Sequence, residues 1–354
     1  MARVLADNRV VPVRVLGLRG PVVQKYLLIV VAAVVVAVAA ADASSYTLYV
    51  LDSILLAAIG ALALDLLMGT GGQVSIGNAA FLAGGAYATV WASRAGVPFP
   101  LDLVIGGLVC AVGGLLVGLP ALRIRGMYLA LGTLAAFYLA DFVGLKYQKH
   151  TVGAAGFFLK PVFSGSILDQ EIGWAWLLLG VLAATIIVVS WLRTGRSGRA
   201  WRMIRDHEVA ASIMGIPVAR YKLALFVITS AIIGIQGGLM AHFTGSVSYD
   251  GFTLSLSISV IAMILIGGLD SQAGPLIGAV VVTLLPVFVP DLVGVFVSSS
   301  TAAQDASGYA EIVYGVLIMI FMIAAPKGLA SLLPALGRKV SSGWRREVVN
   351  ESVD

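Results

Sequence analysis

The residues best suited to chemistry lie in one polar segment, 193–222, of an otherwise apolar chain. It reads RTGRSGRAWRMIRDHEVAASIMGIPVARYK and holds seven of the 23 Lys and Arg residues. Its first part, Arg193 to Arg205, is a basic surface suited to lipid headgroups or an acidic partner. The second part begins with acidic residues and is stopped by Gly-Ile-Pro, which predicts a helix of two to three turns over 206–217. Such a helix can seat in a groove on another protein, or it can be a solvated interfacial helix.

Few other groups offer chemistry. Four carboxylates fall within apolar stretches, where burial is costly and function is the default hypothesis: Asp52, Asp65, Asp102 and Asp141. Asp65 is the deepest, about a turn from the inner boundary, and the others sit near span ends and can reach the interface. The sequence shows no Asp/Glu/His series of the kind a proton relay needs. The near absence of buried paired charges argues against the main alternative function, an ion-coupled secondary transporter.

A membrane enzyme is a further alternative. Of the three histidines, His150 and His242 are expected on the outer side and His207 on the inner side, so they assemble no metal site. His242, at the end of a span, is expected to be a polar cap. The single cysteine, Cys110, is expected to be a buried structural thiol and excludes an internal disulfide. The chain has no GxxxxGK[ST] phosphate loop, so it is not expected to hydrolyse ATP.

The elements that position these groups are membrane spans. The chain is 59% hydrophobic and only 12% charged, against about 25% charged in soluble domains. A crossing helix needs about 20 apolar residues, which predicts an all-α polytopic fold with broken or re-entrant segments and ten spans: 26–41, 48–68, 75–93, 100–119, 127–145, 172–192, 221–242, 254–268, 275–297 and 309–325. The third, eighth and ninth are uncertain in length. Cleavage near Ala41 is an alternative that the closely following span disfavours.

Charge placement predicts the orientation. With both termini in the cytoplasm, the inward segments hold 19 Lys and Arg, including Lys222, and the outward ones hold four: Arg94, Lys146, Lys149 and Lys160. Basic residues are retained on the cytoplasmic side, which supports an even number of spans. We therefore expect one transmembrane domain over 26–325, with its coupling loop at 193–220, between cytoplasmic basic segments at 1–25 and 326–354. Long outward loops are expected at 146–171 and 298–308.

Two clusters, 69–78 and 267–278, mix glycine with polar residues. Irregular backbone at membrane depth persists only where it is buried in protein or lines water. We expect Gln73, Ser75 and Asn78 to line a translocation path, whereas 267–278 is either a re-entrant break or a plain cytoplasmic turn. Eight glycines within spans predict close helix packing: Gly84, Gly85, Gly106, Gly107, Gly113, Gly114, Gly237 and Gly238.

The pattern Glu208-x-Ala210-Ala211-x-x-x-Gly215 is similar to the EAA-type coupling motif of ABC-importer permeases. From about residue 48 to 330 the chain resembles the LivM-like permeases of branched-chain amino acid importers. The resemblance rests on five segments in family order: GGQVSIGNAAFLAGGAYA (71–88), LRIRGMYLALGTL (122–134), SGRAWRMIRDHEVAASIMGIPVARYKLALFVITSAIIGIQGGLMAHF (197–243), ILIGGLDSQAGPLIGA (264–279) and VYGVLIMIFMIAAPKGL (313–329).

The resemblance implies a permease of the bacterial inner membrane that works by alternating access. Glu208, Ala210, Ala211 and Gly215 would couple it to a cytoplasmic ATPase. The implied partners are a second, LivH-like permease, two ATP-binding subunits that hold ATP-Mg, an extracytoplasmic solute-binding protein and membrane lipid, without nucleic acid. No cofactor is expected in this chain.

The chain departs from the family pattern at two places. Asn78 stands where many relatives have histidine, and 150–156 reads HTVGAAG where a Thr-Gly-Gly-rich segment is common. Since urea-type and aromatic-acid-type importers share this class, these departures weaken the assignment to branched-chain amino acids more than the assignment to import.

Overall fold

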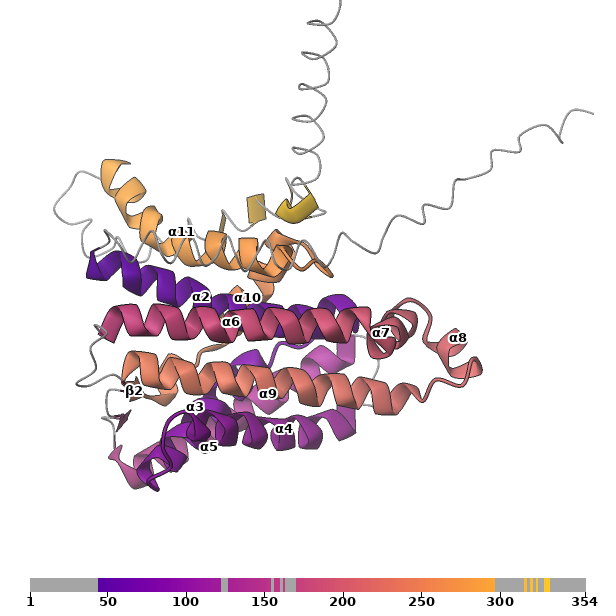
Figure 1. Cartoon of the computed structure of the whole chain (residues 1–354), viewed down its shortest axis with the longest axis horizontal. Coiled ribbons are helices and arrows are strands. Elements are labelled where there is room, and N and C mark those ends of the chain that lie inside the picture. The colour runs from indigo at the N-terminus through magenta and orange to yellow at the C-terminus, as the bar shows by residue number, and fades with distance from the viewer. Residues whose placement is uncertain are drawn as a thin grey trace, which may run out of the picture.

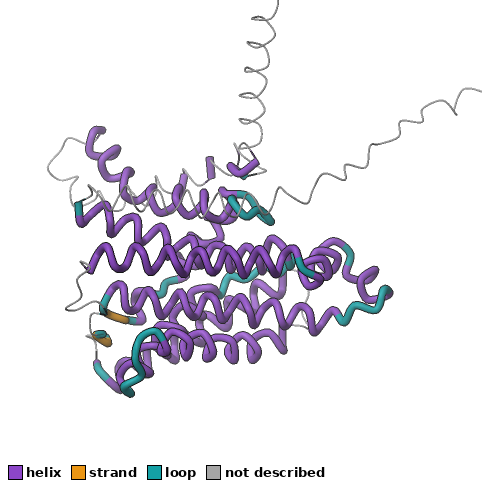
Figure 2. Tube along the Cα trace, viewed as in Figure 1, coloured by secondary structure: helices purple, strands orange, loops and turns teal. Residues whose placement is uncertain are grey.

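The computed structural model describes residues 44–121, 127–153, 156–159, 162, 170–296, 315–316, 319–320, 323 and 328–331. Within them nearly all regular structure is helix (Figures 1 and 2). The longer helices are α2 (Ser45–Asp65), α3 (Asn78–Arg94), α4 (Leu101–Ala121), α5 (Met127–Thr151), α6 (Gln170–Thr194), α9 (Val218–Thr244), α10 (Leu254–Gly267) and α11 (Gly274–Phe296).

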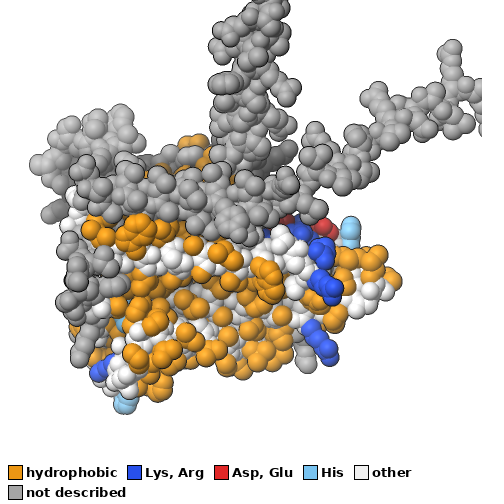
Figure 3. Space-filling model, viewed as in Figure 1, with side chains coloured by type: hydrophobic (Ala, Val, Ile, Leu, Met, Phe, Trp, Pro, Cys, Tyr) orange, Lys and Arg blue, Asp and Glu red, His pale blue; other side chains and the backbone are white. Residues whose placement is uncertain are grey.

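Helix α2 is the centre of the bundle. Its span is 72% buried because α6, α9, α10 and α11 all pack against it. Helices α3, α4 and α9 form a second group on one side (Figure 1). On the described part of the face shown in Figure 3, hydrophobic side chains cover most of the surface, whereas Lys and Arg gather mainly where α7 (Arg196–Asp206) and α8 (Glu208–Ile213) lie. We call this the α7–α8 end and the opposite one, where the short strands β1 (Phe157–Phe158) and β2 (Ser246–Val247) lie, the β1–β2 end.

Glycine lets the helices of the second group approach closely. A Cβ on Gly85 would collide with the backbone of Gly234 on α9, and one on Gly237 would collide with the carbonyl of Leu82. Gly106, Gly107, Gly114 and Gly238 are similarly crowded, which confirms the predicted packing role for six of the eight glycines. Gly84 and Gly113 have room for a methyl group.

Among the described residues, six helices are long and apolar enough to cross a membrane: Ser45–Thr70, Leu101–Pro120, Tyr128–Thr151, Ile172–Thr194, Val218–Thr244 and Tyr249–Gly267. Each corresponds to a predicted span. Helix α3 is shorter, at 17 residues, and the described part of α11 contributes a shorter apolar helix, Gly274–Val287. The predicted span 26–41 lies outside the described residues, as does most of 309–325.

Several details differ from the sequence expectation. The expected span at 75–93 begins at Asn78, because α2 continues as a π-helix, η1 (Leu66–Thr70), and the chain is irregular before α3. Helix α5 extends to Thr151, into the expected loop 146–171. That loop also contains β1 (Phe157–Phe158), which pairs antiparallel with β2 (Ser246–Val247), so the described fold is not purely helical. Short 3₁₀ turns, η3 (Tyr249–Gly251) and η4 (Leu329–Ser331), complete it.

Candidate functional site

The polar loop folds as two helices where the sequence predicted one. Helix α7 (Arg196–Asp206) ends where the His207 N–H donates to the Met203 carbonyl, and α8 (Glu208–Ile213) begins there. The prediction that Asp206 starts the second helix was wrong: Asp206 closes α7, and α8 has six residues in place of two to three turns. The extended His207 backbone separates the two helices.

Gly215 ends α8 in the left-handed conformation that favours glycine, with φ of +82°. Its N–H donates to the Ser212 carbonyl, and the Ile216 N–H donates to the Ala211 carbonyl. A Cβ at Gly215 would meet nothing within 4 Å, so backbone conformation and not crowding calls for glycine. The chain is thereby turned back toward α9.

Three of the predicted coupling residues, Glu208, Ala210 and Ala211, lie on this small helix, and Gly215 follows it. Ala211 is fully buried and faces the protein, while Ala210 is half-buried. The Nζ of Lys222, at the start of α9, donates to Glu208 Oε2 at 2.8 Å, which ties α8 to a membrane-spanning helix. The sequence analysis did not single out the exposed apolar residues Val209, Ile213 and Met214, which are 67%, 81% and 72% exposed. Their i, i+4 spacing was the available signal.

The predicted path residues lie together in the break between η1 and α3. Gln73, Ser75 and Asn78 are all buried. Gln73 Nε2 donates to the Lys222 carbonyl at 3.3 Å, so the break touches the start of α9 beside the Glu208–Lys222 pair. Both amide atoms of the Asn78 side chain lack a hydrogen-bond partner among the described residues.

Neighbouring helices supply polar side chains that stabilise this irregular backbone. The Ile76 N–H donates to Thr133 Oγ1 of α5 at 3.0 Å. The Ala79 N–H donates to Ser257 Oγ of α10 at 2.8 Å. Both acceptors are fully buried. These two backbone N–H groups are thus satisfied by protein, as irregular backbone at membrane depth requires.

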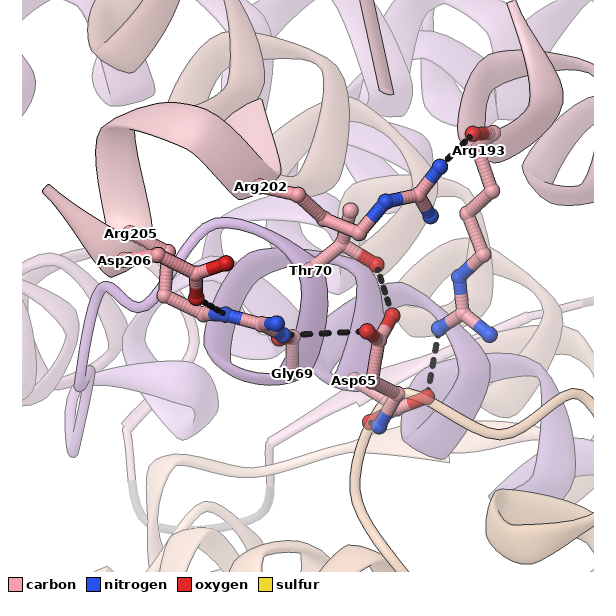
Figure 4. A network of polar contacts seen from close by, with 8 residues as sticks. Asp65, Gly69, Thr70, Arg193, Arg202, Arg205 and Asp206 are labelled. Carbon is pink, nitrogen blue, oxygen red and sulfur yellow. Dashed lines mark hydrogen bonds and ion pairs between the residues drawn. The ribbon is translucent and has the colours of Figure 1, made fainter. Parts of the chain in front are cut away.

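A buried ion pair joins α6 to α2 next to the break (Figure 4). The Arg193 guanidinium, with 4% of the residue exposed, donates to Oδ2 of Asp65, which is fully buried. Asp65 Oδ1 also accepts from the Asp270 N–H in the turn between α10 and α11, at 3.0 Å. The prediction of a basic outer surface from Arg193 onward was therefore wrong for Arg193, because a carboxylate far away in sequence is packed against it.

The same network reaches α7 through Arg205, which donates to the Gly69 carbonyl in η1 and to Asp270 Oδ2 at 3.0 Å (Figure 4). Asp270 Oδ1 in turn accepts from Thr70 Oγ1 at 3.0 Å. Partial burial lowers the pKa of Arg205, but hydrogen bonds to Asp206 and Asp270 outweigh it and raise that pKa above its ordinary value. A permanently charged side chain therefore links the α7–α8 segment to both predicted irregular clusters.

Comparison with known proteins identifies the family. The profile of the family described as "Branched-chain amino acid transport system / permease component" matches residues 46–322, which is most of the chain. The chain belongs to this permease family. The match includes the break, the ion-pair network and α8. The family is a permease component of a transport system and not a catalytic subunit. Together with the six long apolar helices among the described residues, family membership makes the permease a multi-pass membrane protein.

Curated relatives agree. The permease is 30% identical over 294 residues to the high-affinity branched-chain amino acid transport system permease protein LivM of Salmonella typhimurium. That alignment covers 76% of the permease and 66% of the relative, so the permease spans slightly less than two thirds of that protein's length. It is 23% identical over 240 residues to a probable LivM of Methanocaldococcus jannaschii, covering 67% of the permease and 69% of the relative.

Among solved structures, PsaBC from Streptococcus pneumoniae in complex with Fab shows 14% identity and a TM-score of 0.44. The alignment covers 85% of the permease and 98% of that chain. A TM-score of this size is too low to establish a shared fold.

A second buried pair lies at the β1–β2 end of the permease. His242 Nε2 on α9 is 2.6 Å from Asp102 Oδ2 on α4, and both residues are buried. The expectation that Asp102 reaches the interface was therefore wrong. Likewise, the described structure holds the buried Asp65–Arg193 ion pair and the buried Asp102–His242 hydrogen bond where the sequence suggested a near absence of buried paired charges, although they lie at opposite helix ends and not near the midplane.

Within the described part of the permease, no group of three or more His, Cys, Asp or Glu residues could hold a metal ion. Cys110 is buried, as predicted, and its Sγ donates to the Phe81 carbonyl at 3.0 Å.

Proposed function

We propose that this permease is a membrane-spanning subunit of an ATP-driven importer for branched-chain amino acids or a similar small solute, with urea and organic acids as further possibilities. Family membership supports transport. The observation that carries the link to an ATPase is α8, a short helix that presents Val209, Ile213 and Met214 at one end of the bundle while its other side is fixed to the protein. Three exposed apolar residues beside a charged surface are typical of a helix that docks in a partner's groove.

The contacts around α8 supply a route for its motion. Glu208 holds Lys222 at the start of α9, and the neighbouring Lys222 carbonyl accepts from Gln73 in the break. On the other side, Arg205 of α7 holds Gly69 of the π-helix and Asp270 of the α10–α11 turn. When an ATPase pair closes and displaces α8, these bonds would move the irregular segments that interrupt the spans and so open and close the path alternately.

For the topology, we propose ten spans with both termini in the cytoplasm of a bacterial cell and the permease in the inner membrane. This places α7 and α8 inside the cell and β1 and β2 outside. The distribution of 19 inward against four outward Lys and Arg supports the orientation.

The proposed assembly pairs this chain with a second, LivH-like permease, two ATP-binding subunits and an extracytoplasmic solute-binding protein. ATP and Mg²⁺ would be held by the ATP-binding subunits alone. Membrane lipid surrounds the assembly.

The proposal is tested by purifying the tagged chain from its native membrane and identifying what comes with it by mass spectrometry. We expect a second permease and ATP-binding subunits, and we expect the ATP-binding subunits to be lost when Glu208 and Gly215 are replaced together. Recovery of the chain alone, with transport that survives ATP depletion, would contradict the proposal. It would favour the alternative of an ion-coupled transporter.

A further inference from the structure

A pocket lies between α3 and α5 at the β1–β2 end, away from α8 and from the break. Its volume is about 380 Å³, which is within the usual range of small-molecule sites. Most of its wall is aromatic or aliphatic, and one basic residue stands among these side chains: the lining includes Tyr87, Val90, Trp91, Arg94, Tyr147 and Phe157.

The aromatic wall is held in place by the protein itself. The Phe157 ring centroid lies 5.9 Å from that of Tyr87 and 5.7 Å from that of Tyr147. The Tyr87 hydroxyl donates to Oε1 of the fully buried Gln148 at 2.8 Å, and the same oxygen accepts from the Tyr249 N–H at 3.0 Å. Phe157 is further fixed by its strand pairing. The pocket is therefore preformed and needs no ligand to assemble.

Arg94 supplies the only positive charge among the residues that line this pocket. Its guanidinium carbon lies 5.3 Å from the Phe157 ring centroid, a cation–π contact that holds the side chain over the aromatic wall. Among the described residues it forms no ion pair, so its N–H donors remain available. A guanidinium matches a carboxylate with two parallel hydrogen bonds. The pocket thus suits a small carboxylate with an apolar side chain.

Among the six candidate spans in the described residues, α5 is the least buried, with 22% of its apolar window buried. Its exposed side chains within that window are apolar or aromatic, as on Leu131, Leu139 and Phe142. The pocket lies beside the last turn of α5, where Lys149 and His150 are exposed, so it opens at the polar end of that helix. Helix α5 also reaches the break, through Thr133 and Ile76, so it connects the pocket with the buried polar segment that contains Gln73, Ser75 and Asn78.

We propose that this pocket binds the transported solute at the outer entrance of the path, with Arg94 as the group that recognises its carboxylate. The inference rests on the proposed function and narrows the solute to a small carboxylate with an apolar side chain. The aromatic wall receives the apolar side chain.

The test uses the purified permease with its partner subunits in nanodiscs of zwitterionic lipid, without the solute-binding protein. Trp91 lines the pocket, so its fluorescence reports on occupancy, and Trp91→Phe identifies its share of the signal. L-leucine and 4-methylpentanoate are titrated as carboxylate probes, and 3-methylbutylamine as a probe with the same apolar body but no carboxylate. We expect a saturable response to both carboxylates, none to the amine, and weakening of about tenfold in Arg94→Gln.

Lys146→Gln is the matched control, because Lys146 is an exposed positive charge on α5 at the same end of the bundle as Arg94 but does not line the pocket. It should bind as the unsubstituted permease does. Equal binding by Arg94→Gln, or no saturable response to either carboxylate, would overturn the inference. So would a response that appears only when anionic lipid is added, since the pocket would then be a lipid site.

ATP-driven uptake by the complete assembly is measured in parallel with the solute-binding protein present. Intact uptake without pocket binding means that this inference alone is wrong. Absence of ATP-driven uptake means that the proposed function is wrong.

Discussion

At the scale of single residues, the Asp65–Arg193 pair shows how charge is accommodated within this apolar bundle. Neither side chain could remain charged there alone, because removing one partner of a buried pair leaves an uncompensated charge at a cost of about 3–5 kcal/mol. The pair also holds the α10–α11 turn, since Asp65 accepts from the Asp270 N–H.

We therefore expect Asp65→Asn or Arg193→Gln alone to lower the unfolding temperature strongly. The double variant Asp65→Asn/Arg193→Gln should recover most of the loss, because it removes both charges and keeps an acceptor for the Asp270 N–H. Cys110 is buried, so its labelling by a thiol-reactive dye during heating reports unfolding. If the unfolding temperature of the double variant falls by the sum of the decreases in the two single variants, the two charges are not coupled as described.

Gly215 gives a prediction that separates strain from docking. Gly215→Trp should leave the chain inserted in the membrane but abolish transport and ATPase association, because a bulky side chain projects from the exposed end of α8. The backbone strain of a non-glycine residue at positive φ is only about 1–2 kcal/mol.

Gly245→Trp is the matched control. Gly245 has φ of +68° and also has nothing within 4 Å of its Cβ position, but it lies at the β1–β2 end. It should show similar strain and retain the ATPase in co-purification. If both variants lose the ATPase equally, strain and not docking explains the effect.

At the scale of elements, α8 is too short to be stable by itself, so its position depends on α7 and α9. The two faces of α8 therefore have different roles: Ala211 packs inward and holds the helix, while Val209, Ile213 and Met214 are available to a partner. Substitution on the exposed face should therefore affect association without affecting folding.

Replacing Ile213 and Met214 with Ser should reduce ATPase recovery by at least about tenfold, the effect of losing roughly 1.4 kcal/mol or more of apolar contact, and leave the unfolding temperature unchanged. Phe158→Ser, which removes a side chain that is 72% exposed at the other end, serves as the control and should change neither quantity. Normal ATPase recovery with the α8 double variant would show that this face is not the docking surface.

Close approach of α3 and α9 gives a second element-scale test. Gly85→Ala places a methyl group against the Gly234 backbone and should destabilise the permease by about 1–3 kcal/mol. Gly84→Ala, one residue away, meets only Cys110 Sγ at 3.5 Å and should be neutral or slightly stabilising, because alanine favours helix. The fraction of monodisperse protein that survives heating, measured by size-exclusion chromatography, compares them. Equal sensitivity of the two variants would contradict the packing described here.

At the scale of the whole molecule, six helices of spanning length and the packing role of most intraspan glycines could be predicted from the sequence, because both depend on local composition. The ion pairs could not, because Asp65 and Arg193 are 128 residues apart and Asp102 and His242 are 140 apart. Only the packing of α2 against α6, and of α4 against α9, brings them together. The division at His207 was also missed, since Asp206 can equally well end one helix or begin the next.

The candidate site was predictable where it depends on local sequence and not where it depends on contacts between distant segments. Glu208, Ala211 and Gly215 stand in a local pattern, and the structure places Glu208 and Ala211 on α8 and Gly215 in the turn that follows it. The link from the neighbouring helix α7 to η1 runs through Arg205, Asp270 and Gly69, which three separate segments contribute and no local pattern reveals.

The central claim is that ATP hydrolysis by partner subunits drives solute inward through this permease. The most direct measurement is uptake of radiolabelled leucine by vesicles reconstituted with the complete assembly and the solute-binding protein, with ATP supplied only on the α8 side. We expect uptake that requires ATP, is unaffected by ionophores and is lost in the Ile213/Met214 double variant. Uptake without ATP that is driven by an ion gradient would contradict the account.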